Sequence, residues 1–166
     1  MRPEELSEQL RRGSGEYLER RRKIARLALV AAGSMGVISL YQLGVIKHLP
    51  DPPLSVFDSD KVDASEEAYA LFQTPDGPIG LGSYAATLGL AAMGGRDRAE
   101  EHPLIPLALA AKVAFDALQA GKLTVDQITK HRALCSYCLV AAGATFATVP
   151  LVLPEARAAL RALRSG

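Results

Sequence analysis

Both cysteines of the chain stand close together, Cys135 and Cys138, in the stretch HRALCSYCLVAAGATFATVPLVLP. The C-x-x-C spacing puts two sulfur atoms on one side of the first turn of a helix, where unpaired amides and the positive end of the helix dipole stabilise a thiolate. A second thiol nearby then closes a disulfide readily. The pattern therefore predicts a redox-active pair, with Cys135 facing water and Cys138 facing the apolar segment that follows.

A C-x-x-C pair has two other common uses, which the sequence disfavours. The cysteine pair would supply only two of the four ligands of a zinc site, so a second pair is needed, and the only histidines are His48, His102 and His131. A purely structural disulfide within one helical turn has poor geometry. We therefore expect no metal and favour redox chemistry.

The elements that must position the pair are long apolar segments. Of the 166 residues 49% are apolar, and about 20 apolar helical residues span the roughly 30 Å of a bilayer core. Segments of suitable length lie at 24–46, 78–95, 103–120 and 133–153. We predict an all-α integral membrane protein, with a four-helix bundle over 24–154, a basic tail over 1–23 and a second tail over 155–166.

A soluble, alanine-rich helical bundle is the alternative fold. The segments 78–95 and 133–154 are uncharged and apolar on every face rather than along one stripe, which favours the membrane. Lys112 and Asp116 interrupt the third segment, but they are four residues apart and can pair on one helix face. We expect a structural ion pair facing the bundle, with a proton relay as the alternative.

Lysine and arginine are distributed unevenly between the predicted connections. The two tails and the connection 96–102 carry twelve, whereas the connections on the opposite side carry five. The positive-inside rule then predicts a multi-pass protein of the inner (cytoplasmic) membrane, with both termini cytoplasmic and the cysteine pair facing outward. The net charge of +1 gives no indication of nucleic-acid binding, so membrane lipid is the expected surroundings.

The outward connection 47–77 is the longest and carries seven acidic residues. Within it, SEEAYALF at 65–72 predicts a short helix capped by Ser65. Its position over the outer end of the bundle makes this loop a candidate lid.

From about residue 24 to 154 the chain resembles the vitamin K epoxide reductase family. That family has a four-helix membrane bundle, an outward loop between the first two helices, and C-x-x-C at the outer end of the fourth. Its loop motif, roughly Cys-x-x-Val-x-x-Ser, then Phe-Gly-Ile-Pro and Gly-x-x-x-Tyr, is similar to SDKVDASEEAYALFQTPDGPIGLGSY. The matching residues are Val62, Ser65, Phe72, Pro75, Gly80 and Tyr84.

The resemblance implies a thiol–quinone oxidoreductase, because bacterial members oxidise protein dithiols and pass the electrons to a quinone. It implies Cys135 and Cys138 as the catalytic pair, ubiquinone or menaquinone as the cofactor, and a thioredoxin-like dithiol protein as the partner. The residues it suggests for the quinone pocket are Ser65, Asp76, Gly80 and Tyr84. Asp76 matches a polar residue that hydrogen-bonds the quinone, and a helix N-cap is the alternative role.

The sequence departs from the family pattern in its loop. Members normally carry two shuttle cysteines there, which relay electrons from the partner to the C-x-x-C pair. Ser59 occupies the place of one, Asp51 stands about where the other would be, and Ala142 replaces a tyrosine after the second cysteine of the pair. Either an external thiol protein attacks Cys135 directly, or the chain is a degenerate member that serves as a structural or assembly subunit of a membrane complex.

Overall fold

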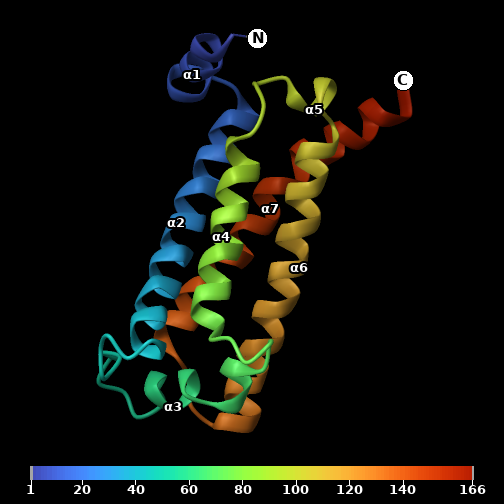
Figure 1. The fold of residues 1–166 in the computed structure, drawn as a ribbon. Coiled ribbons are helices and arrows are strands. Elements are labelled where there is room, and N and C mark those ends of the chain that lie inside the picture. Colours follow the sequence, from blue (N-terminus) through green and yellow to red (C-terminus); the bar gives the residue numbers. More distant parts are fainter. Residues whose placement is uncertain (1, 166) are drawn as a thin grey trace.

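The computed structural model describes residues 2–165, which form helices joined by loops and contain no β-strand. In chain order the elements are α1 (Pro3–Arg12), α2 (Glu16–Gln42), α3 (Ser59–Asp63), the 3-10 helix η1 (Glu66–Tyr69), α4 (Asp76–Ala92), α5 (Arg98–Glu101), α6 (Leu104–Asp126), the π-helical turn η2 (Gln127–His131) and α7 (Ser136–Ser165). Helix α2 packs along α4 and α7, and α6 packs mainly along α7 (Figure 1). Both termini lie at one end of the molecule and α3 at the other, which we call the cysteine end because α7 begins there.

Three helices are long and apolar enough to cross a membrane, namely α2, α6 together with η2, and α7. Large apolar side chains on their outer faces, such as Leu29, Leu118 and Val140, are about half exposed or more, as suits a lipid environment. The predictions of an all-α fold and of a membrane protein are therefore confirmed. Helix α4 is shorter, with 17 residues, or about 26 Å at 1.5 Å per residue.

The helices extend beyond the apolar segments that predicted them. Helix α2 begins at Glu16, well before residue 24, and Glu16 pairs with Arg20 at 2.8 Å in its first turns, where a carboxylate also suits the helix dipole. Helix α7 continues past residue 153 through Pro154 to Ser165. Polar helix ends carry no hydropathy signal, so apolar length alone does not predict where these helices begin and end.

The loop between α2 and α4 differs from the single helix predicted over 65–72. In η1 the N–H of Ala68 donates to the Ser65 carbonyl at 3.1 Å, which is the tighter 3-10 pattern. Ser65 stands at the N-cap of η1, as predicted, but its hydroxyl makes no capping hydrogen bond. Phe72 has a left-handed φ of 53°, which turns the chain before α4 begins.

Helices α2 and α4 approach closely at the cysteine end because α4 carries glycine there. A Cβ at Gly77 or at Gly80 would stand 2.7 Å from Gln42 Oε1 or Met35 Sδ, respectively. The Gln42 amide donates to Asp76 Oδ1 at 2.7 Å and accepts from the Gly77 N–H at 3.0 Å. The first turn of α4 is thus capped from α2. Asp76 lies inside that turn and is not its N-cap.

Two buried arginines hold the opposite end of the bundle. Arg98, 0% exposed, donates to both carboxylate oxygens of Glu155 at 2.7 Å and to carbonyls near the end of α4. Arg21 from α2 donates to carbonyls of residues 91–95. These contacts join α2, α4, α5 and α7 at the end of the bundle opposite the cysteines, and they hold these helices in position relative to one another.

Lys112 and Asp116 form the predicted ion pair within α6, which is confirmed. Ser83 from α4 joins them, since its hydroxyl accepts from Lys112 Nζ at 2.8 Å and donates to Asp116 Oδ1 at 3.2 Å. The side chains of the pair are only 19% and 13% exposed. The pair therefore faces the bundle rather than lipid.

Removing one partner of this ion pair should lower the free energy of unfolding more than removing both partners. Lys112→Ala is expected to lower the free energy of unfolding in detergent by about 3 kcal/mol, because it leaves the Asp116 charge buried with only Ser83 as a partner. The double variant with Asp116→Ala should lose less than Lys112→Ala alone. Equal and additive losses would show that water reaches each charge separately.

Candidate functional site

The cysteine pair stands at the start of α7, as predicted. Cys135 directly precedes the helix and Cys138 lies in its first turn, and both thiols are free. The backbone N–H of Cys138 donates to Cys135 Sγ at 3.0 Å. The Cys138 thiol donates to Asp63 Oδ1 at 3.4 Å. The two sulfurs are therefore placed for disulfide chemistry, with a carboxyl group beside them.

Cys135 is fully buried, so the expectation that it faces water is wrong. Val62 of the loop packs in the same buried cluster, and a short parallel bridge joins the loop to the segment before α7. The N–H of Leu134 donates to the Val56 carbonyl at 2.9 Å, and the N–H of Asp58 donates to the Leu134 carbonyl at 3.0 Å. This pairing lays the loop over Cys135, whereas Cys138 is only partly buried.

A cavity of about 480 Å³ lies at the cysteine end between α2, α4, α6, α7 and the loop, and Cys138 lines it. All four residues that the loop motif suggests for a quinone also line it, namely Ser65, Asp76, Gly80 and Tyr84. Its apolar lining includes Met35, Ile38 and Phe115. Small-molecule sites typically measure about 300–1,000 Å³ and combine apolar walls with a few polar groups, so the cavity fits a ring-sized apolar ligand.

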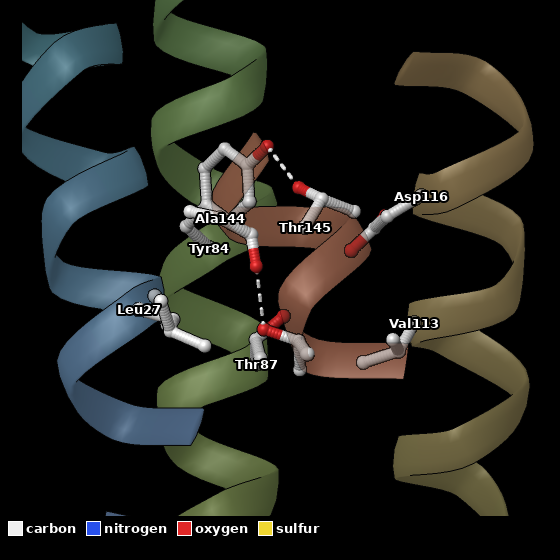
Figure 2. A pocket seen from close by; sticks show the side chains of 9 residues that line it. Leu27, Tyr84, Thr87, Val113, Asp116, Ala144 and Thr145 are labelled. Carbon is white, nitrogen blue, oxygen red and sulfur yellow. Dashed lines mark hydrogen bonds between the residues drawn. The ribbon is translucent and has the colours of Figure 1, made fainter. Parts of the chain in front are cut away.

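Tyr84 lies between this cavity and a void of about 10 Å³ deeper among the same helices. Figure 2 shows its hydroxyl directed at Thr145 of α7, with the two oxygens 2.8 Å apart. Asp116 lines both spaces and points from α6 toward the interior. A phenol can donate one hydrogen bond and accept others, so Tyr84 keeps capacity for a ligand in the larger cavity.

Asp63 is the site residue that the sequence analysis missed. It ends α3, is 1% exposed and lines the cavity. Burial raises its pKa to about 6, against the lowering effect of the neighbouring Cys135 and Cys138 thiols. Its one signal in the sequence was its place directly after Val62 of the loop motif, which packs in the same core cluster as Cys135.

The Asp63 carboxylate and the two sulfurs also lie within 4.8 Å of one another, close enough to hold a cation. Structural zinc sites use four protein ligands. The group found within residues 2–165 has three. It is one ligand short of a structural zinc site, and we assign no metal to it.

The model of the vitamin K epoxide reductase family matches residues 23–153. The chain belongs to this family. The sequence matches no curated protein. Membership in the vitamin K epoxide reductase family implies a membrane thiol–disulfide oxidoreductase with quinone-related activity in general, since members of the family use quinones.

In this vitamin K epoxide reductase family member, the two loop positions expected to hold shuttle cysteines form a hydrogen-bonded pair. The Asp51 carboxylate accepts from the Ser59 N–H and hydroxyl, both at 2.7 Å, and from the Ser136 hydroxyl at 2.6 Å. The Ser136 N–H donates to the Ser59 hydroxyl at 3.1 Å. We call Asp51, Ser59 and Ser136 the clasp. It ties the loop to the residue directly after Cys135.

The charge of Asp51 strengthens the clasp. Burial opposes ionisation of Asp51, but the hydrogen bonds from Ser136 and Ser59 outweigh it and lower its pKa. Hydrogen bonds to a charged group contribute about 1.5–3 kcal/mol each. The clasp therefore ties the loop to α7 without a covalent bond.

Breaking the clasp should expose Cys135. In a Cys138→Ala background, Asp51→Ala is expected to raise the rate of Cys135 alkylation by a maleimide about tenfold, because tenfold corresponds to about 1.4 kcal/mol, less than the clasp contributes. The control Glu66→Ala removes an exposed carboxylate of the same loop and should leave the rate unchanged. Equal rates in both variants would show that the clasp does not cover Cys135.

Proposed function

We propose that the chain is a membrane oxidoreductase that couples oxidation of a partner's dithiol to reduction of a quinone through Cys135 and Cys138. The observation that carries the proposal is the position of the Cys138 thiol, which lines a cavity of about 480 Å³ together with all four residues suggested for the quinone. Cys135 stands one turn away, beneath the loop. Family membership supports the reaction class, and this placement supports a division of roles between the two sulfurs.

The residues of the cavity suit a quinone such as ubiquinone or menaquinone. Met35, Ile38 and Phe115 offer apolar contact for a ring and its tail, and Asp63 and Asp76 offer polar groups. Gln42 holds the Asp76 carboxyl in place. A bound quinone accepts two electrons and two protons. The chain supplies the dithiol that provides them.

The cysteines exchange disulfides in two steps. A thiolate of the partner attacks Cys135 Sγ in the Cys135–Cys138 disulfide, and Cys138 leaves as a thiolate. The partner's second thiolate then attacks the mixed disulfide, which releases oxidised partner and leaves both cysteines reduced. Re-forming the Cys135–Cys138 bond releases two electrons and two protons into the cavity. A thioredoxin-like dithiol protein is the proposed partner.

Access to Cys135 requires the loop to move. Direct attack by an external thiol, the route proposed for a chain without shuttle cysteines, is blocked while the loop covers Cys135. Because the clasp is non-covalent, the loop can open without a redox step. We therefore propose that the loop acts as a lid on the disulfide-exchange side of the pair.

We propose that α4 crosses the membrane as a fourth span and completes a four-helix bundle. Helix α4 packs along α2 over its length (Figure 1). The position of both termini at one end of the molecule supports an even number of crossings. The excess of lysine and arginine at that end supports cytoplasmic termini in an inner membrane and an outward-facing cysteine end.

The test is quinone consumption by purified protein. Protein in detergent is mixed with a soluble ubiquinone analogue and dithiothreitol, and then with a reduced thioredoxin-like protein, while quinone absorbance is followed. We expect consumption that Cys138→Ala abolishes and that the control Glu66→Gln leaves unchanged. Consumption no faster than the background without protein would overturn the proposal and favour the structural or assembly subunit.

A further inference from the structure

One group at the cysteine end has no role in the thiol chemistry described so far. Asp63 Oδ1 accepts from the Cys138 thiol, whereas Asp63 Oδ2 has no hydrogen-bond partner. Among the buried side-chain nitrogen and oxygen atoms of residues 2–165, it is the one atom without a partner. An unsatisfied buried oxygen is costly, so its presence beside two thiols and a cavity calls for a function.

We infer that Asp63 is the proton acceptor of the cysteine pair, taking the thiol proton of Cys138 as the disulfide forms and releasing it into the cavity. The inference rests on the proposed function, and it names a residue for which neither the C-x-x-C motif nor the loop motif gives a role. Asp63 is suited to this role because it touches the reacting sulfur and lines the cavity.

The reaction moves two protons from the thiols to the quinone, and a carboxylate beside the sulfurs can carry them. Oxidation of Cys135 and Cys138 breaks two S–H bonds, forms one S–S bond and releases two electrons and two protons. The electrons reduce the quinone to quinol, which also takes up two protons. Because the Asp63 carboxylate and both sulfurs lie within 4.8 Å of one another, Asp63 can accept each proton in turn and pass it on.

Other side chains hold the two neighbouring carboxylates in hydrogen bonds, which leaves Asp63 available to carry a proton. The Asp51 carboxylate is held by the clasp and the Asp76 carboxylate by Gln42, and both add negative charge near Asp63. A pKa raised to about 6 by burial lets Asp63 both accept and donate a proton near neutral pH. The other ionisable groups that line the cavity are Glu67, Tyr84, Asp116, Asp126 and His131.

The first test measures thiol reactivity and needs no quinone. In a Cys135→Ser background, Cys138 is alkylated with a maleimide from pH 5 to pH 9, with Asp63→Asn compared against Glu66→Gln. Asp63→Asn should remove a rate step near pH 6 and make Cys138 react several times faster at neutral pH, because a negative charge beside the thiol is gone. Glu66 is exposed and does not line the cavity, so Glu66→Gln should change neither feature.

The second test uses the intact cysteine pair. Asp63→Asn is expected to slow quinone consumption about a hundredfold, the lower range of general acid–base contributions. A thiol that loses its rate step near pH 6 in a protein that turns over more slowly is the signature of a lost proton carrier, whereas exposure of the thiol through lost packing would raise the alkylation rate at every pH. Asp63→Glu, which keeps a carboxyl, should restore part of the turnover.

Each outcome decides the inference. Identical alkylation profiles for Asp63→Asn and Glu66→Gln would overturn it, and so would faster alkylation with undiminished turnover. If the unaltered protein consumes no quinone, the proposed function fails, and the alkylation profiles alone decide whether Asp63 holds the thiol proton. Should Asp63→Asn not fold, Asp63→Glu takes its place, and an unshifted pH step would overturn the inference.

Discussion

When Cys138→Ala is mixed with the oxidised donor protein, the Cys135 thiolate should attack the donor disulfide, release one donor thiolate and trap a mixed disulfide, because the Cys138 thiol that would displace the donor is gone. Quinone consumption should fall to the background rate in the same variant. Because Cys135 is fully buried, the trap should form slowly, and Asp51→Ala should speed its formation. Non-reducing electrophoresis and mass spectrometry of the conjugate provide the measurement.

Cys135→Ala should behave in the opposite way. It should abolish exchange with the donor and leave Cys138 free on the cavity wall. A thiolate beside an electron-poor ring absorbs at long wavelength, so added quinone should produce a charge-transfer band in this variant. If both variants trap the donor equally, or neither changes the absorbance of added quinone, the roles assigned to the two sulfurs are wrong.

Glu155→Ala should destabilise the fold by about 3–5 kcal/mol, the range for removing one partner of a buried ion pair. Arg98 is 0% exposed and would be left with backbone carbonyls as its only acceptors. The double variant Arg98→Met with Glu155→Leu should recover much of the loss, because apolar side chains fill the space without a buried charge. Urea unfolding in detergent measures the difference.

The exposed Glu100 in the neighbouring helix α5 supplies the control. Glu100→Ala should change the free energy of unfolding by less than about 0.5 kcal/mol, as surface substitutions usually do. A loss of similar size in Glu155→Ala and Glu100→Ala would show that water enters the Arg98 site. A double variant as unstable as the sum of its single changes would also contradict the account.

Local patterns in the sequence predicted much of this site. Apolar length predicted the membrane helices, and the C-x-x-C spacing placed both sulfurs at the start of a helix. The i,i+4 spacing predicted the pair of Lys112 and Asp116. The loop motif selected four residues that line one cavity, Ser65 directly before η1 and the other three in α4. These features depend on short-range periodicity or on a recognisable motif.

The features that sequence reasoning missed depend on contacts between distant segments. Cys135 is buried where the loop pairs with Leu134, and Asp51 meets Ser136 across 85 residues of sequence. In the sequence Asp63 is one of seven acidic residues of the loop, and only its contact with Cys138 in the folded protein distinguishes it. Neither residue spacing nor hydropathy predicts these contacts, since each depends on how the loop folds back over the bundle.

The most direct measurement is a single turnover of fully reduced protein with quinone in the absence of oxygen. Quinone absorbance gives the quinol formed, and mass spectrometry of peptides gives the Cys135–Cys138 disulfide formed. The account predicts one quinol for each disulfide, with both appearing at the same rate. Quinol without the disulfide, the disulfide without quinol, or no reaction at all would contradict the coupling of this cysteine pair to a quinone.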